Sequence, residues 1–113
     1  MNDAIDRSAL IKMVGDDPAI HTHLLTKFVD TSAQIIAEIL DTCRHRNNAE
    51  TIADLAHKLK SSSMAMGAIE LGQICSALES AGKSSDWITI AELESRLDPI
   101  LSSIREYVGE LKG

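Results

Sequence analysis

The chain has 113 residues, a formal net charge of −6 and 44% hydrophobic residues, but only 3% of its residues are aromatic. This length suits one domain with a single core of Leu, Ile, Ala, Val and Met, and the composition favours helices over a β-sandwich. The acidic charge argues against nucleic-acid binding, and no apolar run approaches the roughly 20 residues that span a bilayer. We therefore expect one all-α domain over residues 1–113.

The first part of the chain predicts a short helix followed by a long one. An amphipathic segment over residues 5–14 ends at Gly15. Asp16 or Asp17 is then expected to cap the long helix, with Pro18 in its first turn, where a missing backbone N–H costs least.

The long helix is expected to continue to about Arg46. Its apolar residues recur at helical spacing, as Ile20, Leu24, Phe28, Ile35, Ile39 and Cys43. Asn47 and Asn48 are expected to form the turn after it. A third helix is then expected from Ala49 to Met66.

Glycines are expected to end the third and fourth helices. Gly67 ends the third, and Gly82 is the first residue beyond the fourth, which carries Ile69, Ile74, Leu78 and Ala81. A last helix follows the cap at residues 84–86 and carries Ile90, Leu93, Leu97, Leu101, Ile104 and Val108. Because Pro99 lies inside it, we expect a kink or short break near Asp98. Short connections predict an antiparallel up-down four-helix bundle, with the short N-terminal helix packed across one end.

His57 is the most informative residue of the third helix. A helical wheel places Ile52, Leu55, Leu59, Ser62 and Met66 within about 40° of the point opposite His57. On the His57 side lie Glu50, Ala53, Asp54, Lys60, Ser61 and Met64. Imidazole has an ordinary pKa of about 6.5, so at neutral pH the ring is mostly neutral and nucleophilic. An exposed ring in this position predicts chemistry on its nitrogen, and acceptance of a phosphoryl group through a labile P–N bond is the first hypothesis.

The neighbours of His57 suit this hypothesis. Lys60, one turn on, supplies a cation for the added negative charge, and the small residues Ala53 and Ser61 leave room for a partner surface. His57 and Glu79 lie ten residues before and twelve residues after the turn at residue 67, so an antiparallel hairpin brings them roughly level. Glu79 is therefore a candidate acceptor that orients the ring and raises its basicity. The alternative is a solvated surface glutamate.

The other histidines and the cysteines do not predict a metal site. His21 and His23 stand two residues apart on a helix, so they face different directions, and Cys43 with His45 has the same fault. We expect His21 and His23 to be surface residues. Cys43 and Cys75 are expected to be reduced thiols of a cytoplasmic protein, since the N-terminus lacks the segments of a signal peptide.

Catalysis of its own is not expected of this chain. Ser61, His57 and Asp54 form a Ser-His-Asp set on paper, but the surface of a helix offers no pocket and no free backbone N–H donors for an oxyanion. The chain also lacks a glycine-rich phosphate loop for ATP.

The run from Ala56 to Ala68, Ala-His-Lys-Leu-Lys-Ser-Ser-Ser-Met-Ala-Met-Gly-Ala, resembles the signature of histidine-containing phosphotransfer (HPt) domains. The family pattern has a histidine, a lysine three residues on, a small residue, Ser or Ala pairs and a later glycine. Ser61 stands where the family often has glycine, a change that we expect to be tolerated. Further matches are Gly15, Asp16, Asp17, Leu24 and Phe28 in the early segment and Leu71, Cys75, Leu78 and Glu79 on the next helix.

The resemblance implies that His57 exchanges a phosphoryl group with the aspartate of a receiver domain, in a response regulator or a hybrid sensor kinase. It implies no cofactor and no metal in this chain, because the magnesium belongs to the receiver. It also implies docking on the second and third helices, for which the candidates are Ala53, Ser61 and Met64 beside His57, and Gln34, Ala37 and Glu38 at the matching level.

We also expect a monomer and, from the charge and the lack of a long apolar run, no contact with nucleic acid or with a membrane. The domain is expected to be cytoplasmic, either free-standing or cut from the C-terminus of a hybrid kinase whose cytoplasmic part it forms. The competing hypothesis is a helical interaction module that binds a receiver or a kinase domain and is never phosphorylated.

Overall fold

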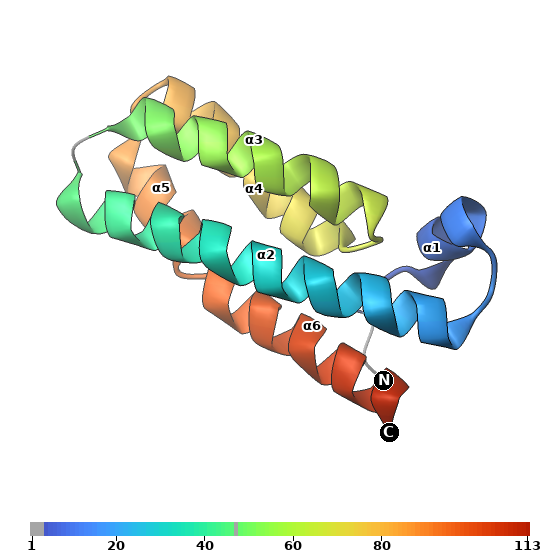
Figure 1. Ribbon diagram of the computed structural model, residues 1–113. Coiled ribbons are helices and arrows are strands. Elements are labelled where there is room, and N and C mark those ends of the chain that lie inside the picture. The colour runs from blue at the N-terminus through green and yellow to red at the C-terminus, as the bar shows by residue number, and fades with distance from the viewer. Residues whose placement is uncertain (1–3, 47) are drawn as a thin grey trace.

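The computed structural model describes residues 4–46 and 48–113, and this part of the chain holds six helices and no strand. They are α1 (Arg7–Val14), α2 (Pro18–His45), α3 (Ala49–Ala65), α4 (Ile69–Lys83), α5 (Trp87–Glu94) and α6 (Leu97–Lys112), as Figure 1 shows. The predicted all-α class is confirmed. Asn47, which we predicted in a turn, lies outside the described residues. No helix in the described ranges combines the length and the apolar character needed to cross a membrane.

Side chains cap the starts of four helices. Asp6 caps α1, Asp17 caps α2, Asn48 caps α3 and Asp86 caps α5, and each accepts a hydrogen bond from a backbone N–H of the first turn. Such a cap satisfies a donor that has no partner inside the helix and contributes about 1 kcal/mol. Of the two residues predicted to cap the long helix, Asp17 makes the bond.

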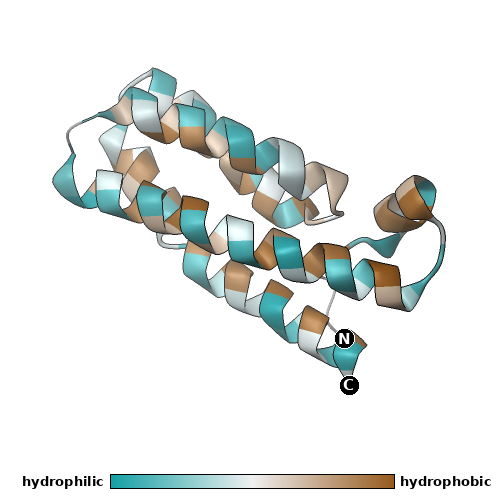
Figure 2. Ribbon diagram, in the orientation of Figure 1, coloured by the Kyte–Doolittle hydropathy of each residue, from teal (hydrophilic) through white to brown (hydrophobic). Residues whose placement is uncertain are grey.

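Consecutive long helices run in opposite directions along the molecule. In Figure 1, α2 leads to the end where α3 begins, α3 returns, and α4 runs back beside α3. The last leg consists of α5 and α6, and α6 lies alongside α2. Hydrophobic residues, brown on the ribbon of Figure 2, recur along these helices. The fully buried side chains of the core include Leu25, Ile39, Ile52, Leu78 and Leu97.

The expected break in the last helix is present, but it falls earlier than we predicted. One helix, α5, ends at Glu94 and the next, α6, begins at Leu97, so Pro99 lies in the first turn of α6. A proline there lacks only an N–H that would have no helical partner, and the break removes the clash with the carbonyl of residue 95. The break therefore precedes Asp98 because proline disturbs the turn before it.

The prediction that Gly82 lies just beyond the end of the fourth helix is wrong. Gly82 lies inside α4, which ends at Lys83, and it is buried against α3. A Cβ atom at this position would lie 2.7 Å from the carbonyl oxygen of Ala49 and 2.9 Å from the Cβ of Ala53. Gly82 is thus required for the close approach of two helices, and not for a turn.

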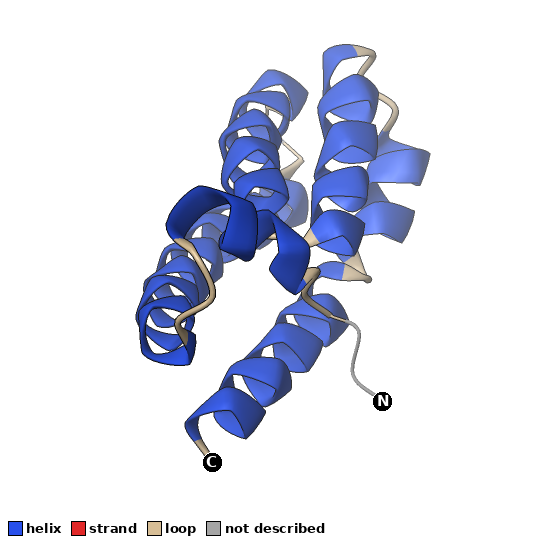
Figure 3. Cartoon of the chain, turned by 90° about the vertical axis from the view of Figure 1, so that its right-hand side faces the viewer, coloured by secondary structure: helices blue, strands red, loops and turns tan. Residues whose placement is uncertain are grey.

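The short helix α1 crosses the end of the molecule at which α2 begins (Figure 3). His21, which we predicted at the surface, is fully buried between α1 and α2, so that prediction is wrong. Its Nδ1 accepts a hydrogen bond from Arg7 Nη2 at 2.8 Å, and its Nε2 donates to the carbonyl oxygen of Gly15 at 2.7 Å. Arg7 of α1 and Gly15, the residue that follows α1, hold this ring, whereas His23, two residues further along α2, is exposed as predicted.

Candidate functional site

His57 lies at the edge of α3 that adjoins α4. The buried residues of α3 are Ala49, Ile52, Ala53, Ala56, Leu59 and Ser63. At about 100° per residue, His57 stands roughly 100° from the centre of this buried stripe, and not at the opposite pole as the helical wheel predicted. Its side chain is 62% exposed to solvent. A ring at the edge is both accessible to a partner and within reach of the neighbouring helix.

The neighbouring helix contributes Glu79, which contacts three nitrogen-bearing side chains. Its Oε2 lies 3.0 Å from Nδ1 of His57 and 3.4 Å from Nζ of Lys83, and its Oε1 accepts a hydrogen bond from Nζ of Lys60 at 2.8 Å. The Glu79 side chain is only 14% exposed. These four residues are called the Glu79 cluster below.

The charge of Glu79 assigns the direction of its bond to the imidazole. The hydrogen bond from Lys60 first, and then those from Lys83 and His57, lower the pKa of Glu79 from 4.5 to about 2 against the opposing effect of burial. An ionised carboxylate only accepts hydrogen bonds, so Nδ1 of His57 is the donor. Nε2 of the neutral ring then carries the lone pair, and no hydrogen bond within the described residues occupies it.

The hairpin of α3 and α4 accounts for this contact. Gly67 ends α3 with a φ of +80° that suits glycine, and its carbonyl oxygen accepts a hydrogen bond from the backbone N–H of Asp6 at 2.8 Å. Gly82 lets the far end of the hairpin close against Ala53. The two helices therefore lie close along their length, and the short side chain of Glu79 reaches the ring. The contact that we predicted between His57 and Glu79 is present in the structure.

Lys60 has a partner in the resting structure that we did not predict from the sequence. We predicted Lys60 as the cation for an incoming phosphoryl group; in the structure it is 32% exposed and is paired with Glu79. Lys83 was missed altogether. Its position four residues after Glu79 on the same helix was the available signal, because side chains at this spacing face each other.

The predicted docking residues divide into exposed and buried positions. Ser61 is exposed and Met64 is 46% exposed, both on α3, and the α2 residues Gln34, Ala37 and Glu38 are exposed as well. In the described residues no hydrogen bond or ion pair joins these α2 positions to the Glu79 cluster. Ala53 is only 2% exposed because α4 covers it, so its assignment to the exposed side of α3 is wrong.

The Ser-His-Asp arrangement considered from the sequence is not formed. The hydroxyl of Ser61 donates to the backbone carbonyl of His57 at 3.4 Å, and the imidazole donates to Glu79. The cysteines offer no alternative nucleophile, because burial raises the pKa of both thiols to about 12. Cys43 and Cys75 are both free and buried. The imidazole of His57, 62% exposed, is therefore the accessible candidate nucleophile among these groups.

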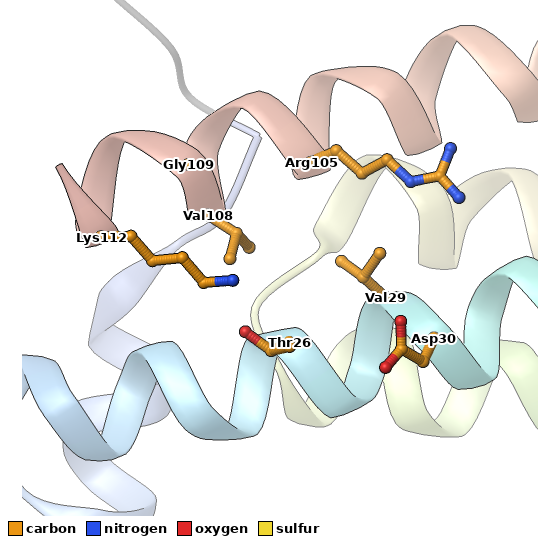
Figure 4. A pocket seen from close by; sticks show the side chains of 7 residues that line it. All are labelled: Thr26, Val29, Asp30, Arg105, Val108, Gly109 and Lys112. Atoms are coloured by element: carbon orange, nitrogen blue, oxygen red, sulfur yellow. The ribbon is translucent and has the colours of Figure 1, made fainter.

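Described residues form two grooves of the surface, and His57 is a lining residue of neither. One of about 210 Å³ lies between α2 and α6, lined by Thr26, Val29, Asp30, Arg105, Val108, Gly109 and Lys112 (Figure 4). Another groove of about 290 Å³ lies between α3 and α4 and adjoins the Glu79 cluster at Lys83; its lining residues are Glu50, Ala53, Asp54, Gly82, Lys83 and Ser85. Among the described residues, no group of three His, Cys, Asp or Glu side chains is arranged to hold a metal ion.

Comparison with known proteins identifies the family of this chain. The sequence model of the Hpt domain family matches residues 23–110, which include the whole Glu79 cluster. No curated protein and no solved structure matches the chain. Hpt domains are helical phosphotransfer carriers in the phosphorelays of two-component signalling, and they interact with receiver domains. Because the match spans most of its length and the all-helical fold agrees with it, the chain belongs to the Hpt domain family.

Proposed function

We propose that this domain is a phosphorelay intermediate that carries a phosphoryl group on Nε2 of His57. The observation that supports this most is the hydrogen bond of 3.0 Å from Nδ1 to Glu79, because it directs the nucleophilic lone pair to Nε2, on a side chain that is 62% exposed. The phosphoryl donor and acceptor is the aspartate of a receiver domain in a response regulator or hybrid sensor kinase.

Lys60 is proposed to stabilise the charge of the phosphoryl group. Its ammonium lies one helical turn from His57 and is held on Oε1 of Glu79 at 2.8 Å. When a phosphoryl group reaches Nε2, Lys60 turns from the carboxylate towards the phosphate oxygens, to which it makes charge-assisted hydrogen bonds. In the resting state Glu79 thus orients the ring of His57 and pairs with the ammonium group of Lys60.

Partner contact is proposed for the exposed residues around the ring. Ser61 and Met64 lie on the same helix as His57, and Gln34, Ala37 and Glu38 lie on α2. We further propose that the domain works as a monomer in the cytoplasm and needs no cofactor of its own, with the magnesium ion held by the receiver.

Transfer of the phosphoryl group from a phosphorylated receiver domain tests this function. Receiver domains of the same organism are phosphorylated with acetyl phosphate, freed of the donor and mixed with this protein. We expect phosphate that is acid-labile and alkali-stable on the wild-type chain and none on His57→Gln. A receiver that binds this chain and keeps its phosphate would instead favour the interaction module, and phosphate on the His57→Gln variant would refute the site.

A further inference from the structure

Attack by a neutral imidazole on phosphorus gives the ring a positive charge. In the resting site the ring proton is on Nδ1, in the hydrogen bond to Glu79. The lone pair of Nε2 forms the new N–P bond while the P–O bond to the donor carboxylate breaks, and that oxygen leaves with the bonding electrons. No proton moves in this step. The phosphorylated ring is therefore a cation whose proton is still on Nδ1.

We propose that Glu79 is the counter-ion of the phosphorylated ring and keeps His57 a readily reversible phosphoryl donor. With the proton on Nδ1, the ring leaves phosphorus as a neutral imidazole when the phosphoryl group moves on. Without that proton it would have to leave as an anionic imidazolide, a much poorer leaving group. The inference rests on the proposed function and assigns Glu79 a role in the phosphorylated state, in addition to orienting the resting ring.

The geometry of the Glu79 cluster favours a negatively charged carboxylate beside Nδ1 of His57 over a neutral hydrogen-bond acceptor. Oε2 lies 3.0 Å from Nδ1, and the carboxylate is only 14% exposed, so water screens this pair less than it would at an open surface. A glutamine would accept the same hydrogen bond without the charge. Orientation alone therefore does not need a carboxylate, whereas stabilisation of a cationic ring does.

The two lysines make this arrangement compatible with a phosphate dianion nearby. Lys60 from α3 and Lys83 from α4 are the charged groups that face the carboxylate in the described residues, and they hold it ionised. The buried thiol of Cys75, close to Lys60, stays protonated because burial raises its pKa to about 12. Since Lys60 occupies Oε1, its departure to the phosphoryl group leaves the bond from Oε2 to the ring intact.

The pH dependence of the phosphohistidine lifetime tests the proposal. The full-length domain is loaded with phosphoramidate, a small N–P donor that releases ammonia, and the loss of phosphate is followed from pH 5 to pH 10. The comparison uses wild type, Glu79→Gln, and Glu70→Gln as the matched control, since Glu70 is an exposed glutamate in the first turn of the same helix.

We expect the wild-type ring to retain its proton, and hence its lability, to a pH about one unit or more above that of Glu79→Gln. At pH 8 this corresponds to phosphate loss about tenfold slower in Glu79→Gln. Glu70→Gln should behave as wild type. Identical profiles for wild type and Glu79→Gln, or an equal shift in Glu70→Gln, would overturn the counter-ion role.

Two further outcomes separate this inference from the proposed function. If wild type accepts phosphate neither from phosphoramidate nor from a receiver, the phosphorelay function itself fails. If only Glu79→Gln fails to load, folded wild type is compared with loaded wild type unfolded in urea, where Glu79 no longer faces the ring. The folded protein is then expected to remain labile to the higher pH, and equal profiles overturn the inference.

Discussion

Glu79 on α4 accepts a hydrogen bond from Nδ1 of His57 on α3 at 3.0 Å, across 22 residues of sequence. One carboxylate therefore orients the ring and, through its second oxygen, holds Lys60 at 2.8 Å. Each of these links can be broken singly, and the effects on folding and on phosphoryl transfer are expected to separate.

Replacing His57 by glutamine is expected to abolish phosphate acceptance and leave the fold nearly unchanged. The side chain is 62% exposed, and surface changes of this kind usually alter the free energy of unfolding by about 0.5 kcal/mol or less. Circular dichroism melts measure the stability of the fold, and transfer from a phosphorylated receiver measures phosphate acceptance. An unfolded variant would make His57 a structural residue instead.

Leu59→Ala is expected to have the opposite effect. Leu59 is fully buried on α3, and a leucine-to-alanine cavity lowers the free energy of unfolding by about 2–5 kcal/mol. Denaturant titration measures this loss, and transfer per folded molecule should stay near the wild-type rate. A large transfer defect in the fully folded variant would place Leu59 in the site.

Lys60→Ala is expected to slow transfer from the receiver by roughly 10- to 100-fold while changing the Tm by only a few degrees. A charge-assisted contact to phosphate contributes about 1.5–3 kcal/mol, whereas the resting contact of a partly exposed lysine contributes about 0–1 kcal/mol. Lys58→Ala is the control, because Lys58 is exposed and lies about 100° around the helix from His57. Equal defects in both variants would mean that only general positive charge matters.

The lowered pKa of Glu79 predicts how the stability depends on pH. A carboxyl whose pKa falls from 4.5 to about 2 on folding stabilises the protein above its ordinary pKa, and the stabilisation is lost as the pH falls towards the folded value. The Tm of wild type should therefore exceed that of Glu79→Gln at neutral pH, and the difference should disappear near pH 2. Thermal melts of both proteins from pH 7 downwards measure it, and a difference that does not change with pH would contradict the assignment.

Two glycines provide a matched test of helix packing. Gly82→Ala is expected to destabilise the protein, because the added Cβ would lie 2.7 Å from the backbone oxygen of Ala49. Gly109→Ala, in α6, meets nothing within 4 Å and should raise the free energy of unfolding by about 0.5–1 kcal/mol through helix propensity. Denaturant titration should give opposite signs. A Gly82→Ala variant as stable as wild type, or more stable, would show that α3 and α4 do not depend on Gly82 for their approach.

The sequence by itself determined the helices and selected His57 as the candidate reactive side chain. Local patterns sufficed for this, because apolar spacing, caps such as Asp17 and the run around His57 depend on residues near one another in the chain. The position of Glu79 opposite His57 was also predictable, because a hairpin with a short turn fixes which residues of its two helices stand opposite each other.

Only the tertiary structure decided which faces are covered and which charges meet. α4 covers Ala53 and approaches α3 closely at Gly82, and α1 covers His21. These three residues are therefore buried, although the sequence around them did not predict it. Likewise the pairing of Lys60 and Lys83 with one carboxylate depends on how closely α3 and α4 approach. Burial and ion pairing arise from neighbours that are distant in sequence, and the periodicity of one helix carries no information about them.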